Sequence, residues 1–390
     1  MENYNQLIRD KKLPQLFVFG MYRSGTTVIA RLLAGENKIA FSSDPIRPFF
    51  NWYRTALQKN IGYTEAEDHT RPLGDYFRGD INYIKKLMDA KFLEKIKKSE
   101  LVSIRERVIR HGLEYSPKFI NNLKQSLHLT FSNYAEELKY YLGLIMHTYG
   151  NSNTRLVGLK EVWSIEMALP IINMIGEDAK ILIVLRDPLD IIASSFSGSN
   201  KYCILSLVRQ WRKQAVFYSF LKNLYPNQVT SINYEDFCLK PIILKEKIKN
   251  LINNSENIFS NKFNLSDDYG NSWIKNSSYK DEKPSNFIDN KSIRRYLKVL
   301  SESEIEWAIY LTHMSSYTKY NRSNSFPSKP NTPYPKKNIN NIPDWSKFDT
   351  LKLEGNDLDK ELKLEHNRIV KISTIKDQTE INESIITNQI

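Results

Sequence analysis

The sequence predicts an α/β protein in which helices flank a parallel sheet. Two short apolar runs lead to this prediction, one at residues 16–20 and one at residues 180–185. The first run is followed by a glycine-bounded turn and then by apolar residues at helical spacing. The second run is apolar throughout, as expected for a strand that helices cover on both faces. Strands and helices alternate around it, which is typical of a parallel sheet with right-handed crossovers.

The first strand, turn and helix form one unit. Residues 16–20 (Leu-Phe-Val-Phe-Gly) are the predicted strand, and residues 21–27 turn the chain. Gly35 is placed to end the helix that follows. One face of that helix carries the apolar side chains of Val28, Ile29, Leu32 and Leu33. This order of elements opens many nucleotide-binding α/β folds.

A mainly helical insert, rich in aromatic side chains, is predicted after this unit, over residues 46–150. The α/β pattern then resumes with a strand at 155–160, a helix at 165–175 and the buried strand at 180–185. A fourth strand is predicted at 229–233.

The helix after the buried strand has a recognisable start. Asp187 fits the N-cap position, Pro188 the first helical position and Asp190 the third. A basic amphipathic helix is predicted beyond Pro241, with apolar residues at helical spacing.

The chain changes character near its C-terminal end. We predict one α/β domain over residues 1–325 and a linker with a polar extension over residues 326–390, because the latter is rich in Pro, Asn and Lys. One short helix is predicted within the extension, around residues 358–364.

Length and composition indicate an ordinary globular protein. The 390 residues are 41% hydrophobic and 26% charged, which is enough apolar material for a large core. No apolar run has the length of a membrane-spanning helix, and Arg23 interrupts the first apolar run. We therefore expect no signal peptide, no membrane association, a mature protein that is the whole chain, and a cytoplasmic location. The two cysteines, Cys203 and Cys238, are expected to be small buried residues, and no metal site is expected.

The charge balance is basic. There are 56 Lys and Arg residues against 44 Asp and Glu residues, which gives a formal net charge of +12. Such a charge favours an anionic partner, but it is also compatible with lysines spread over solvated surfaces. The basic residues are scattered and no nucleic-acid-binding motif occurs, so we expect no nucleic-acid partner.

Three chemically distinctive segments follow predicted strands. They are residues 21–27, 160–163 and 186–195. Because the carboxyl ends of parallel strands meet at one edge of a sheet, these segments are expected to converge there and to bind a ligand.

The first of these segments makes the fold P-loop-like. Residues 20–27 (Gly-Met-Tyr-Arg-Ser-Gly-Thr-Thr) match the pattern GxxxxGK[ST] except that Thr26 stands in the position of the lysine. Backbone N–H groups in such a turn bind anions, and Arg23 would supply the missing charge. No acid suited to hold Mg²⁺ follows the buried strand, because that strand leads into Arg186. A sulfuryl group carries less negative charge than a phosphoryl group, so such a site can move it without Mg²⁺.

Arg186 and Ser194 are a second candidate anion site. Arg186 leaves the sheet at its carboxyl edge, and Ser194 lies about two turns into the following helix. A guanidinium and a hydroxyl group that converge there suit a phosphate monoester. An ion pair of Arg186 with a neighbouring aspartate is the alternative.

Four segments together resemble the sulfotransferases that use 3′-phosphoadenosine-5′-phosphosulfate (PAPS), especially the bacterial-type members. Residues 17–27 resemble the loop around the 5′-phosphosulfate, and residues 183–194 resemble the 3′-phosphate motif. Residues 158–161 (Gly-Leu-Lys-Glu) resemble the strand-end lysine segment, and residues 234–237 (Tyr-Glu-Asp-Phe) another recurrent segment. The four occur in family order and lie within residues 14–280.

The resemblance implies a sheet of about five strands with PAPS across its carboxyl edge. The residues that it implies as donor contacts are Arg23, Ser24, Gly25, Thr26 and Thr27 on the 5′ side, and Arg186 and Ser194 at the 3′-phosphate.

The sequence departs from the cytosolic eukaryotic branch in three ways. Arg23 replaces the usual loop lysine, and Val28 replaces a tryptophan that often stacks on adenine. The late loop with glycine and lysine is missing, and residues 273–278 are the candidate replacement. The nucleotide contacts proposed within that segment are Lys275, Ser277 and Ser278.

Several residues are candidates for the catalytic base. Val162 occupies the position of the histidine that cytosolic members use. Asp44 follows the first βα unit, where several bacterial-type members carry an acid, and Glu161 is its rival at a strand end. The remaining candidates are His69 and His147 of the insert. An aspartate before a proline is also common as a simple turn residue.

The function that this sequence predicts is in-line sulfuryl transfer from PAPS to a hydroxyl or amine of a small molecule or glycan. Arg23 and Lys160 would stabilise the developing charge, a carboxylate or imidazole would take the acceptor proton, and the insert would shape the acceptor pocket. A P-loop kinase or nucleotide hydrolase would share the fold but need Mg²⁺. A non-catalytic polyanion-binding protein would account for the charge alone.

Overall fold

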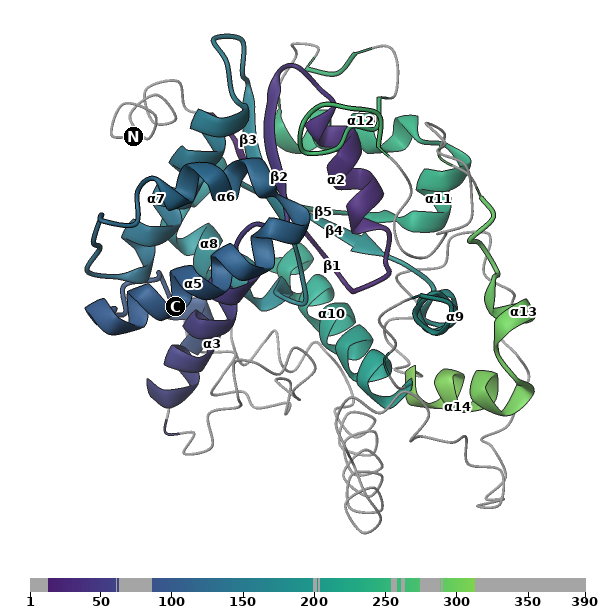
Figure 1. Ribbon diagram of the computed structural model, residues 1–390. Helices are drawn as coiled ribbons and strands as arrows, with labels where there is room; N and C mark the ends of the chain where they lie inside the picture. The colour runs from purple at the N-terminus through teal and green to yellow at the C-terminus, as the bar shows by residue number, and fades with distance from the viewer. Residues whose placement is uncertain are drawn as a thin grey trace.

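A single sheet of five parallel strands forms the centre of the molecule, with strand order β2-β3-β1-β4-β5 (Figure 1). This computed structural model describes residues 13–60, 62, 86–198, 202, 204–253, 258–260, 264–273, 288 and 290–312. The strands are β1 (Gln15–Gly20), β2 (Ile39–Ser43), β3 (Leu156–Val162), β4 (Ala179–Leu185) and β5 (Val229–Asn233). The predicted fold class is confirmed, as are the four strands placed from the sequence.

The central strand β1 faces two cores. Phe17 and Phe19 belong to one cluster of buried apolar residues, whereas Leu16 and Val18 belong to the other. This alternation follows from the period of two in a β-strand, and it explains why β1 is apolar throughout.

Helices cover both faces of the sheet (Figure 1). On one side, α2 (Thr26–Ala34) and α12 (Ile242–Ile252) contribute to the same core as Leu16 and Val18, and α11 (Tyr234–Leu239) precedes α12. The other helices are α3 (Arg47–Asn60), α5 (Lys98–Tyr115), α6 (Pro117–Lys124), α7 (Tyr134–Tyr149), α8 (Ala168–Ile175), α9 (Pro188–Phe196), α10 (Ile204–Leu224), α13 (Tyr296–Val299) and α14 (Glu302–Thr312). Most of their buried residues join the cluster around Phe17 and Phe19.

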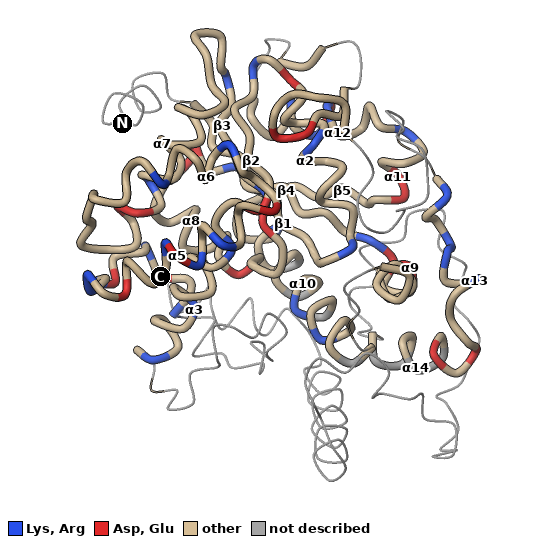
Figure 2. The backbone as a smooth tube through the Cα atoms, viewed as in Figure 1, with Lys and Arg blue, Asp and Glu red and all other residues tan. Residues whose placement is uncertain are grey.

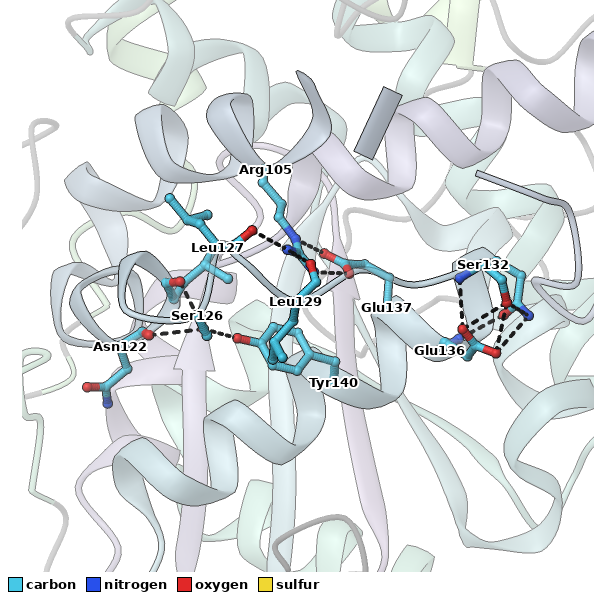
Figure 3. A network of polar contacts seen from close by, with 11 residues as sticks. Arg105, Asn122, Ser126, Leu127, Leu129, Ser132, Glu136, Glu137 and Tyr140 are labelled. Carbon is cyan, nitrogen blue, oxygen red and sulfur yellow. Dashed lines mark hydrogen bonds and ion pairs between the residues drawn. The ribbon is translucent and has the colours of Figure 1, made fainter. Parts of the chain in front are cut away.

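The predicted helical insert is observed as α3, α5, α6 and α7, and a buried ion pair joins two of these helices (Figure 3). Arg105 of α5 donates from Nε and Nη2 to the two carboxylate oxygens of Glu137 of α7, at 2.9 and 2.7 Å. Its Nη1 donates to the carbonyl oxygen of Leu129 at 2.6 Å. A bidentate pair with a further hydrogen bond links the two helices with defined geometry, although the pair itself adds little net stability.

The predicted start of α9 is confirmed. The Asp187 side chain accepts a hydrogen bond from the Leu189 N–H at 2.8 Å, and Pro188 is the first helical residue. Asp190 instead accepts hydrogen bonds from the Arg294 and Tyr296 N–H groups, at 2.8 and 3.2 Å, so it anchors a distant segment.

Several predictions lie outside the described residues. They concern His69, Lys275, Ser277, Ser278, Cys203, the short helix at 358–364 and the C-terminal extension 326–390.

Within the described part of the chain, no helix is both long and apolar enough to cross a membrane. No group of three or more potential ligand side chains is found there that could hold a metal ion. Lysines and arginines lie along several helices, including α3, α5 and α10, and of these three helices only α5 also carries acidic residues (Figure 2).

Candidate functional site

The loop between β1 and α2 is shaped by glycine. Gly25 has a φ of 88°, in the left-handed region, and occupies the N-cap position of α2 without a side-chain cap. A β-carbon at Gly25 would overlap the ring of Tyr234, so this position needs glycine for space as well as for conformation. The first N–H groups of α2 are left without a side-chain partner, which is the arrangement that binds an anion.

The side chains of this loop differ in burial and in the groups that they contact. Ser24 is fully buried, and its hydroxyl donates to the Met21 carbonyl oxygen at 2.7 Å, so it holds the turn together. Thr26 is also buried, against Gly20. Arg23 has a φ of 64°, and its guanidinium lies over the Tyr22 ring and against Gly198 just after α9.

Lys160 of β3 connects this loop with the end of β2. Its ammonium group forms an ion pair with Asp44 Oδ2 and a hydrogen bond of 3.4 Å to the Thr27 hydroxyl. The backbone prepares this contact, because the Asp44 N–H donates to the Lys160 carbonyl oxygen at 2.7 Å. Asp44 has a φ of 52°, which turns the chain around the end of the neighbouring strand. Its Oδ1 is buried and has no hydrogen-bond partner among the described residues.

Glu161 is the next residue of β3 after Lys160, and it contacts the same segment between β2 and α3 at Ile46. It is fully buried, and its Oε1 accepts a hydrogen bond of 2.6 Å from the Ile46 N–H at the start of α3. Its Oε2 has no partner among the described residues. Burial, with a smaller contribution from the nearby Asp44 carboxylate, raises the pKa of Glu161 well above its usual value. The neutral acid is therefore favoured at this position.

Arg186 lies on the far side of the loop from Lys160. Its Nη1 donates to the Arg23 carbonyl oxygen at 2.6 Å and its Nη2 to the Ser292 carbonyl oxygen at 3.0 Å, and the guanidinium lies over the Tyr234 ring. Arg186 is not ion-paired with Asp187 or Asp190 within the described residues, although this was the alternative considered from the sequence. Ser194 of α9 is buried to 6% exposure, and its hydroxyl has no partner among the residues described.

Three further side chains, which the sequence did not suggest, lie close to one another near the end of β3. They belong to Arg47, His111 and Trp163. Arg47, in the first turn of α3, donates from Nη2 to His111 Nδ1 at 3.4 Å and lies over the Trp163 ring. Burial, together with the adjacent Arg47 charge, lowers the pKa of His111 to about 3, so the ring is neutral. Trp163 packs with Tyr22 and Tyr202, with ring centroids 5.4 and 5.5 Å away, and the two tyrosine rings lie 5.0 Å from each other.

The sequence carried one signal for Arg47 and none for His111. Arg47 is a cation at the start of a helix whose first turn contains no acid, where the helix dipole disfavours positive charge. His111 approaches from α5, 64 residues away, without a local motif. The earlier candidate His147 is exposed on α7.

The predicted segments therefore converge at the carboxyl edge of the sheet. Arg23, Gly25 and Thr27 follow β1, Lys160 and Glu161 lie near the carboxyl end of β3, and Arg186 follows β4. An uncapped helix N-terminus, an ammonium group and two guanidinium groups can together hold a strongly anionic ligand.

Comparison with known proteins shows that this chain matches the model of one protein family. The model of the sulfotransferase family, Sulfotransfer_3, matches residues 14–252, which include every element from β1 to α12. No protein with a curated description matches this chain.

Three solved structures are similar at low sequence identity. The sulfotransferase domain from the curacin biosynthetic pathway is 14% identical, with 76% of this chain and 97% of that domain covered and a TM-score of 0.43. The sulfotransferase domain from the Synechococcus PCC 7002 olefin synthase is 14% identical, with 77% and 94% covered and a TM-score of 0.36. The sulfotransferase STF9 from Mycobacterium avium is 15% identical, with 64% and 68% covered and a TM-score of 0.33.

Proposed function

This chain belongs to the sulfotransferase family, and we propose that it transfers the sulfuryl group of PAPS to a hydroxyl or amine of a small-molecule or glycan acceptor. The observation that carries the proposal is the position of Lys160. It lies between the anion-binding loop and a carboxylate, and so can serve both sides of a group transfer.

The donor would lie across the loop between β1 and α2. We assign its 5′ side to the uncapped N-terminus of α2, with Arg23 and Thr27, and its 3′-phosphate to Arg186 and Ser194. Two of the N–H groups of Arg186 hold backbone carbonyls, and its Nε has no partner among the described residues. Arg186 can thus order the loop and still donate to a phosphate.

The transfer would proceed by in-line displacement. The acceptor oxygen or nitrogen forms a bond to sulfur while the bond from sulfur to the bridging oxygen breaks, and that oxygen leaves with the electron pair as part of the nucleotide. Lys160 is placed to stabilise the negative charge that develops there, since its ammonium group already reaches the Thr27 hydroxyl. Arg23 and the loop N–H groups would assist.

Asp44 is our assignment for the base. Its Oδ2 pairs with Lys160, whereas its Oδ1 has no partner among the residues that the structure describes and would accept the acceptor proton. Glu161 is less suited, because its raised pKa favours a carboxyl group that already holds a proton. Two neighbouring carboxyl groups in different environments would thus have different roles.

Titration calorimetry of the full chain tests the proposal. We expect 3′-phosphoadenosine-5′-phosphate, titrated in EDTA, to bind more tightly than ATP does, whether ATP is titrated in EDTA or in a separate buffer with Mg²⁺ and no EDTA. We also expect [³⁵S]PAPS turnover, measured with a panel of hydroxyl and amine acceptors, to be unaffected by EDTA. Tighter binding of ATP in the presence of Mg²⁺ would instead support a kinase.

A further inference from the structure

Arg47 is a positively charged residue of the candidate site, and the proposed reaction assigns it no role. It is the first residue of α3 and lies three residues after Asp44, which directly follows β2. Its partners are neutral, namely the His111 imidazole and the Trp163 ring. They orient the guanidinium without compensating its charge.

The neighbouring carboxyl groups do not neutralise Arg47. Asp44 is ion-paired with Lys160, and Glu161 accepts from the Ile46 N–H. Arg47 forms an ion pair with no carboxylate among the residues that the structure describes, and its Nε is buried without a hydrogen-bond partner. A half-buried cation at the positive end of a helix dipole, without an acid in that turn, is unfavourable in the free protein.

Two further hydrogen-bond donors near Arg47 lack a partner within the described part of the chain. His111 Nδ1 accepts from Arg47, so in the neutral ring the proton is on Nε2, which has no partner among the described residues. The Trp163 indole Nε1–H is likewise unmatched. The surroundings of Arg47 thus offer hydrogen-bond donors and positive charge.

We propose that Arg47 binds an anionic group of the acceptor, a carboxylate, and so selects acceptors that carry one. This rests on the sulfotransferase function proposed above. The planar guanidinium suits a carboxylate, which accepts two parallel hydrogen bonds. A carboxylate at Arg47 would direct the rest of the acceptor toward Asp44, which the chain places three residues earlier.

The donor is served by other cations. Arg23 lies over Tyr22 and Arg47 lies over Trp163, and these two rings contact each other at 5.4 Å between centroids. The two arginines therefore border different rings of one aromatic cluster. Arg23 belongs to the loop of the proposed donor site, whereas Arg47 belongs to the helix that follows Asp44. The aromatic side chains next to Arg47 favour a carboxylate attached to an apolar or aromatic body.

The test compares two probes of the same shape, benzoate and benzamide, by ligand-observed NMR and calorimetry on the full chain. Each is titrated with and without bound 3′-phosphoadenosine-5′-phosphate. The variant is Arg47→Gln. Arg110→Gln is its control, because it removes the same charge from an exposed position of α5. Arg47→Lys, which keeps the charge but loses the planar fork, is a second variant in case Arg47→Gln does not fold.

We expect wild-type protein to bind benzoate about tenfold or more tightly than benzamide, the range for a charge-assisted hydrogen bond. This preference should vanish in Arg47→Gln, weaken in Arg47→Lys and persist in Arg110→Gln, with nucleotide affinity unchanged in all. Equal binding of the two probes to wild type, or no binding of benzoate, would overturn the proposal. So would a loss of nucleotide affinity in Arg47→Gln without a loss of the benzoate preference, which would place Arg47 on the donor side. The titrations without nucleotide keep this result independent of the PAPS proposal.

Discussion

The ammonium group of Lys160 is ion-paired with the carboxylate of Asp44, and both side chains are buried. The pair joins the carboxyl ends of β2 and β3, which also share a hydrogen bond from the Asp44 N–H to the Lys160 carbonyl oxygen. Lys160 also reaches the hydroxyl of Thr27, in α2 just after the loop that follows β1. The proposed base and donor sites are therefore connected through one side chain.

The first prediction concerns the stability of this pair. Removing one partner of a buried ion pair leaves the other charge uncompensated, which costs about 3–5 kcal/mol. Asp44→Asn and Lys160→Met should each lower the free energy of unfolding substantially, and the double variant should lose less than the sum of the two. Urea denaturation of the four proteins measures this coupling. Strictly additive losses would show that the two side chains do not interact.

The second prediction concerns the base. If Asp44 accepts the acceptor proton, Asp44→Asn should lower kcat by about 10²–10⁴-fold, while nucleotide affinity stays nearly unchanged. Glu161→Gln should lower kcat much less, because the neutral carboxyl group is already favoured at that position. Steady-state kinetics and calorimetry on folded variants measure both effects. A larger kcat defect in Glu161→Gln than in Asp44→Asn would transfer the role to Glu161.

The third prediction concerns pH and the acids behind Arg186. Burial, with the nearby Asp190 and Glu235 carboxyl groups, raises the pKa of Asp187 to about 7, against the opposing effects of the Leu189 N–H and Arg186. Because the raised pKa belongs to the folded state, the contribution of Asp187 to stability is greatest below about pH 4 and is lost as the pH rises through about 7.

Asp187→Asn keeps an acceptor for the Leu189 N–H but cannot ionise. It should therefore increase the free energy of unfolding at pH 8, by up to about 4 kcal/mol, and leave it nearly unchanged at pH 4. The exposed Asp89→Asn is the control and should show no such pH dependence. A variant that is equally or less stable than wild type at pH 8 would contradict the raised pKa.

Much of the fold was predictable from the sequence because its signals are local. The apolar runs at β1 and β4 and the start of α9 at Asp187 each depend on neighbouring residues. The strand β2 has no clear signal in the sequence, because its five residues, Ile-Ala-Phe-Ser-Ser, end in two serines and lack an extended apolar run. It becomes a strand through its parallel pairing with β3, which is a long-range interaction.

Only part of the candidate site is predictable from the sequence. The loop residues and Arg186 follow strands, so topology alone brings them to one edge of the sheet. The contact of Lys160 with Asp44 depends on the pairing of β2 with β3, and that of Arg47 with His111 on the packing of α3 against α5. Such contacts between distant segments leave no pattern in a single sequence.

The most direct test of the account compares 3′-phosphoadenosine-5′-phosphate with AMP, which lacks only the 3′-phosphate, in wild type and in Arg186→Ala. Arg186 also holds the Arg23 carbonyl oxygen, so the variant should weaken both nucleotides somewhat. If Arg186 grips the 3′-phosphate, calorimetry should show an additional loss of about 10- to 150-fold for the 3′-phosphorylated nucleotide alone, the effect of removing a charge-assisted contact. Ser194→Ala should show a smaller loss with the same selectivity. An equal loss for both nucleotides in Arg186→Ala would contradict the account, because the site would then not recognise the 3′-phosphate that distinguishes PAPS.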